Sequence, residues 1–522
     1  MQRSFTFVFL LVVLLRCVVP LAAQEAVEWP TTEWPTSTPE EQGMDSAELA
    51  GLFANFSQPF FNMDGLMVVR HGVNVAEVYA PPQTAEIPHH MASGAKSVVA
   101  TLIGALLQEG KLESLDTPVL SLFPDRTVQN PSPEKEAITV RHLLTMSSGL
   151  ACDANAPGDT TNVGIENSED WLQYVLDLPV TAEPGTEWRY CNAAISVLSA
   201  LITELTGISA LDYAKEVLFE PLSINDVAWG ANPQGTNMGA ADLFMTVPDM
   251  AKLGYLYLHG GEWDGQQIIP ADFAAEATHT QINTPWDGFC YGYLWWTDCA
   301  NTYAYALGAG GTYIVVNPSQ DTVIVHTGGA PEAIRVAIQG FPFLYMANAL
   351  TLSDEPLSAN PGAFAQLEEV IAAVENPEPQ PIPDAPAMAG QVSGQNFFVM
   401  NPFQLEKPGG WATNSSGPVG SLAFDFNDPA QAAVTFGMAD GKVWTAPVGL
   451  DGLPMVSESP VGPMAVHGQW VSNDTFRMYL ENVGDGQITQ MDVQFFPGWL
   501  RIVGSEYKDS NAWAALGFAP PQ

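Results

Sequence analysis

Apolar residues recur with the period of a helix at several places before residue 375. Residues 45–56 carry one apolar stripe, and Asp45 stands where an N-cap is expected, so a helix should begin there. Residues 96–110 carry apolar side chains on a broad face, which predicts a central, buried helix ending at Gly110. Further helical patterns cover residues 170–178, 192–205, 247–258 and 363–374. The region from about 111 to 277 should therefore be mainly helical.

Strand patterns flank this helical region. The segment GLMVVR, a His71-Gly72 turn and VNVAEVYA together predict a β-hairpin. Residues 291–326 contain YGYLWWT, TYIVV and TVIVHT, which are rich in the β-branched and aromatic residues that favour strands. Strands at both ends of the unit and helices in its middle predict an α/β fold, a sheet flanked by helices with an inserted helical lobe.

The last part of the chain has a different pattern. Residues 376–386 read NPEPQPIPDAP, which cannot continue a helix and predicts a linker. Beyond it come the apolar segments FFVM, SLAFDF, AAVTF, KVWTAPV, PMAVHGQW, TFRMYL, ITQMDVQFF and WLRIV. Roughly eight strands at this spacing predict an antiparallel barrel or sandwich. We expect an α/β domain at 24–375, a linker at 376–387 and an all-β domain at 388–522.

The first residues read MQRSFTFVFLLVVLLRCVVPLAAQEA. A positive start, an apolar stretch and small residues up to Ala23 predict a signal peptide at 1–23, and hence an exported protein, periplasmic or extracellular. A retained membrane anchor is the alternative, but Arg16 interrupts a run that is already short for a span of about 20 residues. No other apolar run is long enough to span a membrane.

Removal of that segment, with Cys17, leaves Cys152, Cys191, Cys290 and Cys299. An even set of cysteines in an oxidising compartment is compatible with disulfides. Of the three possible pairings we favour Cys152–Cys191 and Cys290–Cys299; the alternative is four free buried thiols. No C-x-x-C or Cys/His cluster occurs, so we expect no metal site.

Composition narrows the possible partners. The 522 residues are 47% hydrophobic and 14% charged, which is apolar enough for a large core. The chain has 17 Lys and Arg against 58 Asp and Glu, a formal net charge of -41. Such a surface repels nucleic acid and anionic membranes, because phosphate binding needs clustered Lys and Arg. We interpret it as a solvated acidic surface and expect a small-molecule partner.

Candidate chemistry begins with Ser93 and Lys96, at the start of the predicted central helix. A spacing of three residues puts both side chains on one helix face. A serine hydroxyl needs a nearby base to become a nucleophile, and a partly desolvated lysine can serve. The N–H groups at the helix start suit a developing oxyanion. The alternative is a helix cap, with the serine at the N-cap and the lysine in solvent.

The sequence around this motif resembles the active-site helix of the serine β-lactamase and penicillin-binding-protein superfamily. In that family the S-x-x-K helix runs into a "GKL…LD.PV…P" turn, matched here by residues 110–112, 115–119 and 124. The resemblance covers about residues 39–329 and is strongest to class C-like esterases and 6-aminohexanoate-oligomer hydrolases. The C-terminal part resembles, more loosely, a lipocalin-like β domain. The resemblance implies the β-lactamase fold and an acyl-enzyme mechanism.

Tyr190-Cys191-Asn192 resembles the second motif of this family, Y-x-N. The resemblance implies that Tyr190, with its phenol acidified by Lys96, carries protons. It also implies that Asn192 orients Lys96 or the acyl side chain of the substrate. A core tyrosine is the alternative for Tyr190.

The third motif of the family, K-T-G, does not occur in this sequence. The candidate in its place is Ala309-Gly310-Gly311, ahead of the TYIVV segment, although another alignment would use Gly308. Glycines let the backbone approach a substrate closely. The resemblance then implies an oxyanion hole made by the N–H groups of Ser93 and Thr312. Without the motif's lysine, strong binding of a carboxylate-bearing antibiotic is not expected.

Two other pairs of residues lie close to these motifs in sequence. His89 and His90 precede the nucleophile, and we interpret them as a solvated loop pair, although one could line the pocket. Trp295 and Trp296 could form an aromatic wall for the substrate, or alternate between core and surface along a strand.

Together these features predict an exported serine hydrolase that cleaves small esters or amides through an acyl-enzyme on Ser93, without metal or cofactor. A β-lactamase or D-amino-acid peptidase would use the same chemistry on another substrate. A third hypothesis is a non-catalytic, wall-associated protein that binds a ligand with its β domain.

Overall fold

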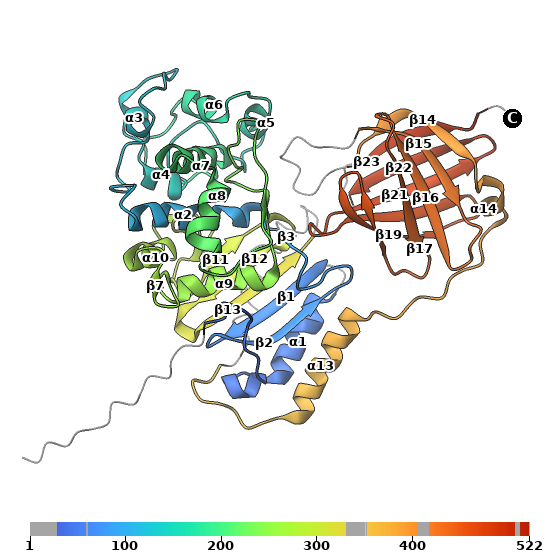
Figure 1. Cartoon of the computed structure of the whole chain (residues 1–522), viewed down its shortest axis with the longest axis horizontal. Coiled ribbons are helices and arrows are strands. Elements are labelled where there is room, and N and C mark those ends of the chain that lie inside the picture. Colours follow the sequence, from blue (N-terminus) through green and yellow to red (C-terminus); the bar gives the residue numbers. More distant parts are fainter. Residues whose placement is uncertain are drawn as a thin grey trace, which may run out of the picture.

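The computed structural model describes residues 29–58, 61–329, 350, 352–405, 417–506 and 512–520. The signal peptide expected at residues 1–23 lies outside the described residues. Figure 1 shows an α/β body and a β-barrel, with residues 376–386 running between α13 (Pro361–Glu375) and α14 (Ala387–Val392) without helix or strand. The domain boundaries expected from the sequence stay predictions.

The α/β body is built on an antiparallel sheet with the strand order β2-β1-β13-β12-β11-β10-β9-β8. These strands are β1 (Met63–Arg70), β2 (Val73–Tyr79), β8 (Ile282–Asn283), β9 (Phe289–Tyr291), β10 (Trp296–Asp298), β11 (Ala304–Leu307), β12 (Tyr313–Asn317) and β13 (Thr322–Gly328). The predicted hairpin β1–β2 is confirmed, and β1 also pairs with β13, so the two ends of the unit meet in the middle of the sheet.

Helices cover both faces of this sheet (Figure 1). On one face Leu66 and Val68 of β1 pack in a core with α1 (Ser46–Phe56) and α13 (Pro361–Glu375). On the other face Met67 and Val69 join the core of α2 (Ala95–Gln108) and α9 (Val247–Leu258). Alternate residues of β1 therefore serve two different cores, which explains why the whole strand is buried.

The central helix predicted over residues 96–110 is confirmed as α2 (Ala95–Gln108), which is buried along most of its length. The other helices of this body are α3 (Pro133–Glu136), α4 (Val140–Leu144), α5 (Thr161–Glu166), α6 (Trp171–Asp177), α7 (Asn192–Thr206), α8 (Ala210–Ala214), α9 (Val247–Leu258) and α10 (Ala271–Ala277). Short strands are β3 (His89–His90), β4 (Ala228–Trp229), β5 (Leu243–Met245), β6 (Glu262–Trp263) and β7 (Gln266–Gln267). The prediction of a mainly helical lobe is confirmed.

The segment YGYLWWT is not the single strand that its composition predicts. It turns sharply between β9 and β10, where Gly292 N donates to Trp295 O at 2.8 Å and Leu294 has φ +57°. Trp295 is buried against Tyr257, and Trp296 is half-buried at the start of β10. Aromatic residues suit a buried turn as well as a strand, so propensity alone could not separate the two.

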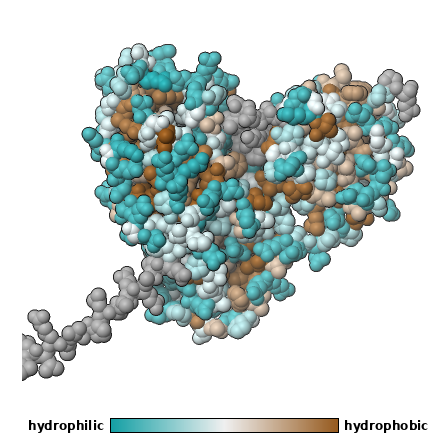
Figure 2. Space-filling view, viewed as in Figure 1, coloured by the Kyte–Doolittle hydropathy of each residue, from teal (hydrophilic) through white to brown (hydrophobic). Residues whose placement is uncertain are grey.

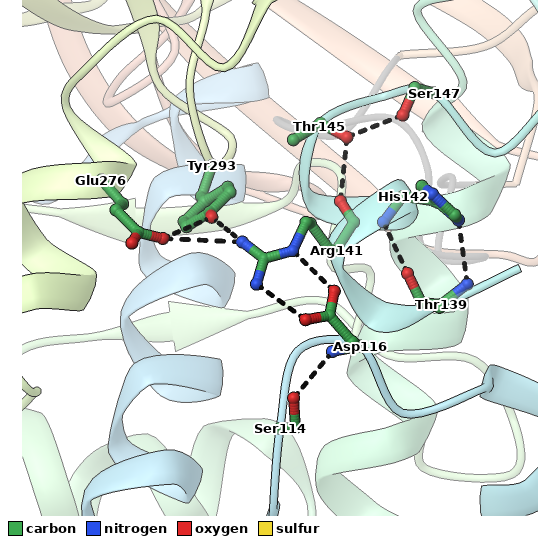
Figure 3. A network of polar contacts seen from close by, with 9 residues as sticks. All are labelled: Ser114, Asp116, Thr139, Arg141, His142, Thr145, Ser147, Glu276 and Tyr293. Atoms are coloured by element: carbon green, nitrogen blue, oxygen red, sulfur yellow. Dashed lines mark hydrogen bonds and ion pairs between the residues drawn. The ribbon is translucent and has the colours of Figure 1, made fainter. Parts of the chain in front are cut away.

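A polar cluster fixes this turn against the helical lobe (Figure 3). Arg141 of α4 donates to Asp116 at 2.8 Å and to the hydroxyl of Tyr293, which itself donates to Glu276 at 2.7 Å. The next residue, Leu294, accepts a hydrogen bond at its carbonyl from Ser97 Oγ at 2.9 Å. The cluster therefore holds the turn against α4 and α10, and the Ser97 hydrogen bond ties it to α2, one residue beyond Lys96.

The C-terminal body is an antiparallel barrel with the order β17-β16-β15-β14-β23-β22-β21-β20-β19-β18, closed by a β17–β19 pairing. Its strands are β14 (Asn396–Phe403), β15 (Val419–Asp425), β16 (Gln431–Met438), β17 (Val443–Gly449), β18 (Met455–Ser459), β19 (Gly462–Trp470), β20 (Thr475–Asn482), β21 (Ile488–Phe496), β22 (Trp499–Glu506) and β23 (Ala512–Phe518). The helix α14 (Ala387–Val392) precedes them. The predicted barrel is confirmed, and large buried side chains such as Phe397, Phe436 and Phe476 form its core.

Two strands of this barrel were not predicted from the sequence. β18 reads MVSES and has no buried residue, and β23 reads AWAALGF, which is rich in small residues. Neither pattern carries the regular apolar alternation seen in β16 and β20.

The visible surface is largely hydrophilic. Figure 2 shows hydrophilic residues spread over both bodies, with hydrophobic ones in separate patches. Within the described part of the chain no single helix is long and apolar enough to cross a membrane; one bent pair, Asn192–Thr206 with Ala210–Phe219, passes by length and composition only.

Candidate active site

Ser93 lies in a short 3-10 turn, Ala92–Gly94, that leads directly into α2. Ala92 has φ +45°, a left-handed conformation that is uncommon for a residue with a Cβ and is often found at functional sites. Lys96 follows one helical turn later and is only 1% exposed. Its Nζ donates to Ser93 Oγ at 2.9 Å and to Ala240 O at 2.8 Å. The alternative interpretation, a helix cap with Lys96 in solvent, is therefore wrong.

Tyr190 comes to this pair from the segment that precedes α7. The Nζ of Lys96 lies 4.9 Å from the centroid of the Tyr190 ring. The backbone beside the tyrosine is tied by the Cys152–Cys191 disulfide, and Cys290–Cys299 closes a second loop, so both predicted pairings are confirmed. The structure thus brings together three side chains that the sequence singled out from two distant motifs.

An aromatic cluster surrounds Tyr190. Its ring stacks on Trp296 with centroids 5.9 Å apart, and Trp188 contacts both rings. Trp286 packs on Trp188 and Trp296 while remaining 43% exposed, so the cluster reaches the surface. Tyr291 lies beneath it; burial, with Tyr190 nearby, raises the pKa of Tyr291 well above its usual value. Tyr291 therefore stays protonated and is no candidate base.

Asn192, the other polar residue of the second motif, is the first residue of α7. Its side-chain Oδ1 is buried and has no hydrogen-bond partner among the described residues. The role that the resemblance implies for Asn192 therefore stays a prediction.

The glycines of the third segment lie against the nucleophile turn. Gly310 and Gly311 have φ of +80° and +99°, a region that favours glycine. A Cβ at Gly310 would lie 2.5 Å from Gly328 O, and one at Gly308 would lie 2.2 Å from Met91 O. The chain therefore needs glycine at these two positions to approach its neighbours this closely.

Thr312, the predicted second oxyanion donor, is buried at the end of this glycine segment. Its hydroxyl donates to His90 O at 3.2 Å, and its carbonyl accepts from Gly308 N at 2.7 Å. The glycine segment and the nucleophile segment are thus joined directly by a hydrogen bond.

The interpretation of His89 and His90 as a solvated pair is wrong. His89 Nε2 lies 2.7 Å from Asp64, and His90 Nδ1 lies 2.9 Å from Asp485, with Asp242 at 3.6 Å from Nε2. Both histidines are buried in β3. Burial alone would lower the pKa of His90, but the two carboxylates raise it to about 9. The two carboxylates therefore favour the charged form of His90.

A third buried histidine was not identified from the sequence. His326 of β13 places Nδ1 2.5 Å from Gly311 O. Burial lowers the pKa of His326 to about 4, so the neutral ring donates this hydrogen bond. Its sequence signal is a histidine directly after three apolar residues in the strand TVIVHT.

Among the described residues, no group of three or more His, Cys, Asp or Glu side chains could hold a metal ion.

A serine hydroxyl bonded to a buried lysine one helical turn along, with a tyrosine ring beside the lysine, is the arrangement of a serine hydrolase of the acyl-enzyme class. The β-lactamase family model matches residues 40–327, more than half of the 522 residues. The chain therefore belongs to the β-lactamase family.

Several relatives are hydrolases. A 6-aminohexanoate-dimer hydrolase of Paenarthrobacter ureafaciens is 22% identical over 291 residues, which cover 52% of this chain and 73% of the relative. Esterase EstB of Burkholderia gladioli is 27% identical over 164 residues, which cover 29% of this chain and 41% of the esterase. A solved structure from Bacillus anthracis, described as a candidate 6-aminohexanoate-dimer hydrolase, has a TM-score of 0.51 at 20% identity and covers 61% of this chain and 87% of that chain. This last likeness shows the fold alone.

Proposed function

We propose that the chain is an exported hydrolase of small esters or amides that works through an acyl-enzyme on Ser93. The observation that carries the proposal is the 2.9 Å hydrogen bond between Lys96 Nζ and Ser93 Oγ, with the Tyr190 ring beside the lysine. A buried lysine in contact with a serine hydroxyl can take up its proton.

The mechanism uses residues of all three segments. Lys96 and Tyr190 take the proton of Ser93, whose oxygen attacks the carbonyl carbon of the substrate. The N–H groups of Ser93 and Thr312 stabilise the oxyanion. Tyr190 returns a proton to the leaving alcohol or amine, and water then hydrolyses the acyl-enzyme.

The lining of the site and the relatives support this substrate class. The aromatic cluster around Tyr190, with Trp286 at the surface, favours an apolar group next to the reacting carbonyl. The names of the relatives above include an esterase and a 6-aminohexanoate-dimer hydrolase. The absence of a K-T-G lysine favours these substrates over carboxylate-bearing β-lactams.

Export is supported by the two disulfides and by the signal-like first residues. Expression of the full chain in a bacterial host should yield an exported protein whose N-terminus begins after residue 23. Retention of the uncleaved chain in the cytoplasm would contradict this part of the proposal.

The nucleophile is tested with a fluorophosphonate, which we expect to label Ser93 alone. S93A should lose labelling and the turnover of p-nitrophenyl esters and anilides, while S121A, which changes an exposed serine, should keep both. Nitrocefin turnover faster than that of every ester would favour a β-lactamase. Labelling at another serine would refute the assignment.

A further inference from the structure

The barrel reaches the α/β body through the loop between β20 and β21, residues 483–487. In this loop Gly484 O accepts a hydrogen bond from His90 N at 2.6 Å, and Asp485 Oδ1 lies 2.9 Å from His90 Nδ1. His90 is 8% exposed and Asp485 is 5% exposed, so this contact is made away from water. A buried carboxylate is costly unless it is paired, and the His90 ring supplies the partner.

His90 lies three residues before the nucleophile. Its backbone links the nucleophile segment to the glycine segment. Its carbonyl accepts the hydroxyl of Thr312 at 3.2 Å. The following residue, Met91, donates its N–H to Leu243 O at 2.8 Å and packs against Gly308. A shift of His90 would therefore move both N–H groups of the proposed oxyanion hole.

A second contact leads from the same loop to the glycine segment. Gly486 packs so closely on Gly329 that a Cβ at Gly329 would lie 1.7 Å from Gly486 O. Asn62 Nδ2 donates to Gly486 O at 3.1 Å, and Asn62 O accepts from Gly329 N at 3.1 Å. A Cβ at Gly310 would in turn lie 3.5 Å from the Cα of Gly329. The barrel loop therefore contacts both the segment that leads to Ser93 and the residues packed against the glycine segment.

We propose that this barrel loop is part of the catalytic apparatus, with Asp485 as a positioning residue that acts through His90 on Ser93 and Thr312. The inference rests on the proposed function and deepens it, since it gives the barrel a role in the reaction. The barrel then sets the geometry of the oxyanion hole, which a mere cover or solubility domain would not do.

The first test compares two barrel aspartates. D485N and D485A should lower kcat for a p-nitrophenyl ester by about 10- to 100-fold, because displacements near 1 Å at a reacting group cost rates of this order. KM should stay within about twofold, since substrate contacts are unchanged. D492N is the matched control: Asp492 pairs with Arg477 at 2.6 Å on the barrel and has no contact with His90. It should keep kcat within about twofold.

The second test is a double-mutant cycle with H90Q. If Asp485 acts through His90, the double variant H90Q/D485N should be no slower than the slower single variant. Losses that multiply would mean independent effects and would overturn the inference. The inference would also be overturned if D485A kept the full kcat while the wild-type enzyme was labelled at Ser93.

A third measurement does not depend on turnover. Backbone amide hydrogen exchange over residues 89–94 should be faster in D485A than in D492N. Equal exchange in the two variants would refute the link between barrel and nucleophile. If the wild-type protein neither hydrolyses esters nor reacts with the fluorophosphonate, the proposed function is refuted. The exchange comparison would still test whether the barrel loop stabilises the nucleophile segment.

Discussion

Two backbone segments meet at the active site, residues 89–96 with the nucleophile and residues 308–312 with the glycines, and buried histidines help to hold both. On the nucleophile side His90 lies between the carboxylates of Asp485 and Asp242, which raise its pKa to about 9. On the glycine side His326 donates to Gly311 O, and burial lowers its pKa to about 4. One segment is thus held by charge and the other by a neutral hydrogen bond.

The comparison shows two ways to fix a backbone at an active site. The nucleophile side is held by charged groups from distant parts of the chain. It also carries Lys96, whose position matters for the reaction. The glycine side has few side chains and relies on close approach, because any Cβ at Gly308 or Gly310 would collide with a carbonyl. The activity should therefore be sensitive to changes of charge on the nucleophile side and to changes of side-chain volume on the glycine side.

The largest effect is expected from removing the base on the nucleophile side. K96M should lower kcat by at least about 10³-fold, because Ser93 loses the group that accepts its proton. Steady-state ester hydrolysis measures this. K111M, which changes a largely exposed lysine paired with Glu109 at 2.7 Å, is the control and should leave kcat unaltered. A K96M enzyme of normal rate would exclude Lys96 as the base.

A change of volume should break the glycine side almost as strongly. G310A should lower kcat by about 10²-fold, because the new Cβ meets Gly328 O and displaces the oxyanion donor. Gly265 offers a matched control, since it has φ +79° and nothing within 4 Å of an added Cβ. G265A should therefore lose some stability through its backbone conformation but no activity. Equal kcat losses in the two variants would show that the clash is irrelevant.

The two histidines should oppose each other in the pH dependence of stability. His90 has a folded pKa of about 9, above its usual 6.5, so its contribution is complete below pH 6.5 and is lost as the pH rises through 9. His326 has a folded pKa of about 4, so its contribution is complete above pH 6.5 and is lost as the pH falls through 4.

Melting temperatures of H90Q, H326Q and wild type between pH 4 and 10 test this opposition. The difference from wild type should shrink at alkaline pH for H90Q and at acid pH for H326Q. Burial, with Asp64 nearby, raises the pKa of Glu481 on the barrel, so its contribution to the stability of all three proteins falls as the pH rises above its usual value of 4.5. A difference that is constant with pH for either variant would contradict the charge assigned to that ring.

The smallest effect is expected where the two segments join. T312V keeps the shape of the side chain and removes the hydroxyl that donates to His90 O at 3.2 Å. We expect a loss of about 1 kcal/mol in the free energy of unfolding and a few-fold fall in kcat. Urea denaturation and ester hydrolysis measure the two. T435V, which changes a threonine on the barrel surface, should leave kcat as it is.

How much of the fold and the site could be predicted from the sequence depends on how far apart along the chain the contacting residues lie. Ser93 and Lys96 lie one helical turn apart, so their contact is encoded locally and was predicted. Tyr190 was found only through the resemblance of its surroundings to a known motif. The barrel was predicted because most of its strands alternate apolar and polar residues, while β18 and β23 do not and were missed.

The environment of His90 could not be predicted in the same way. Its partner Asp485 is 395 residues away, within Gly-Asp-Gly, a sequence that reads as an ordinary turn. Nothing in the neighbourhood of either residue shows that the two will pair. Such contacts depend on the docking of whole domains, and the mistaken picture of a solvated histidine pair has this cause.

The contact between His90 and the loop of β20 and β21 has a consequence for biosynthesis. The ribosome makes the nucleophile early and the loop that supports it near the end of translation. Under the proposed role of Asp485, a nascent or truncated chain carries the reactive serine without a finished site. The hydrolase would then become active only after its C-terminal barrel has folded and docked.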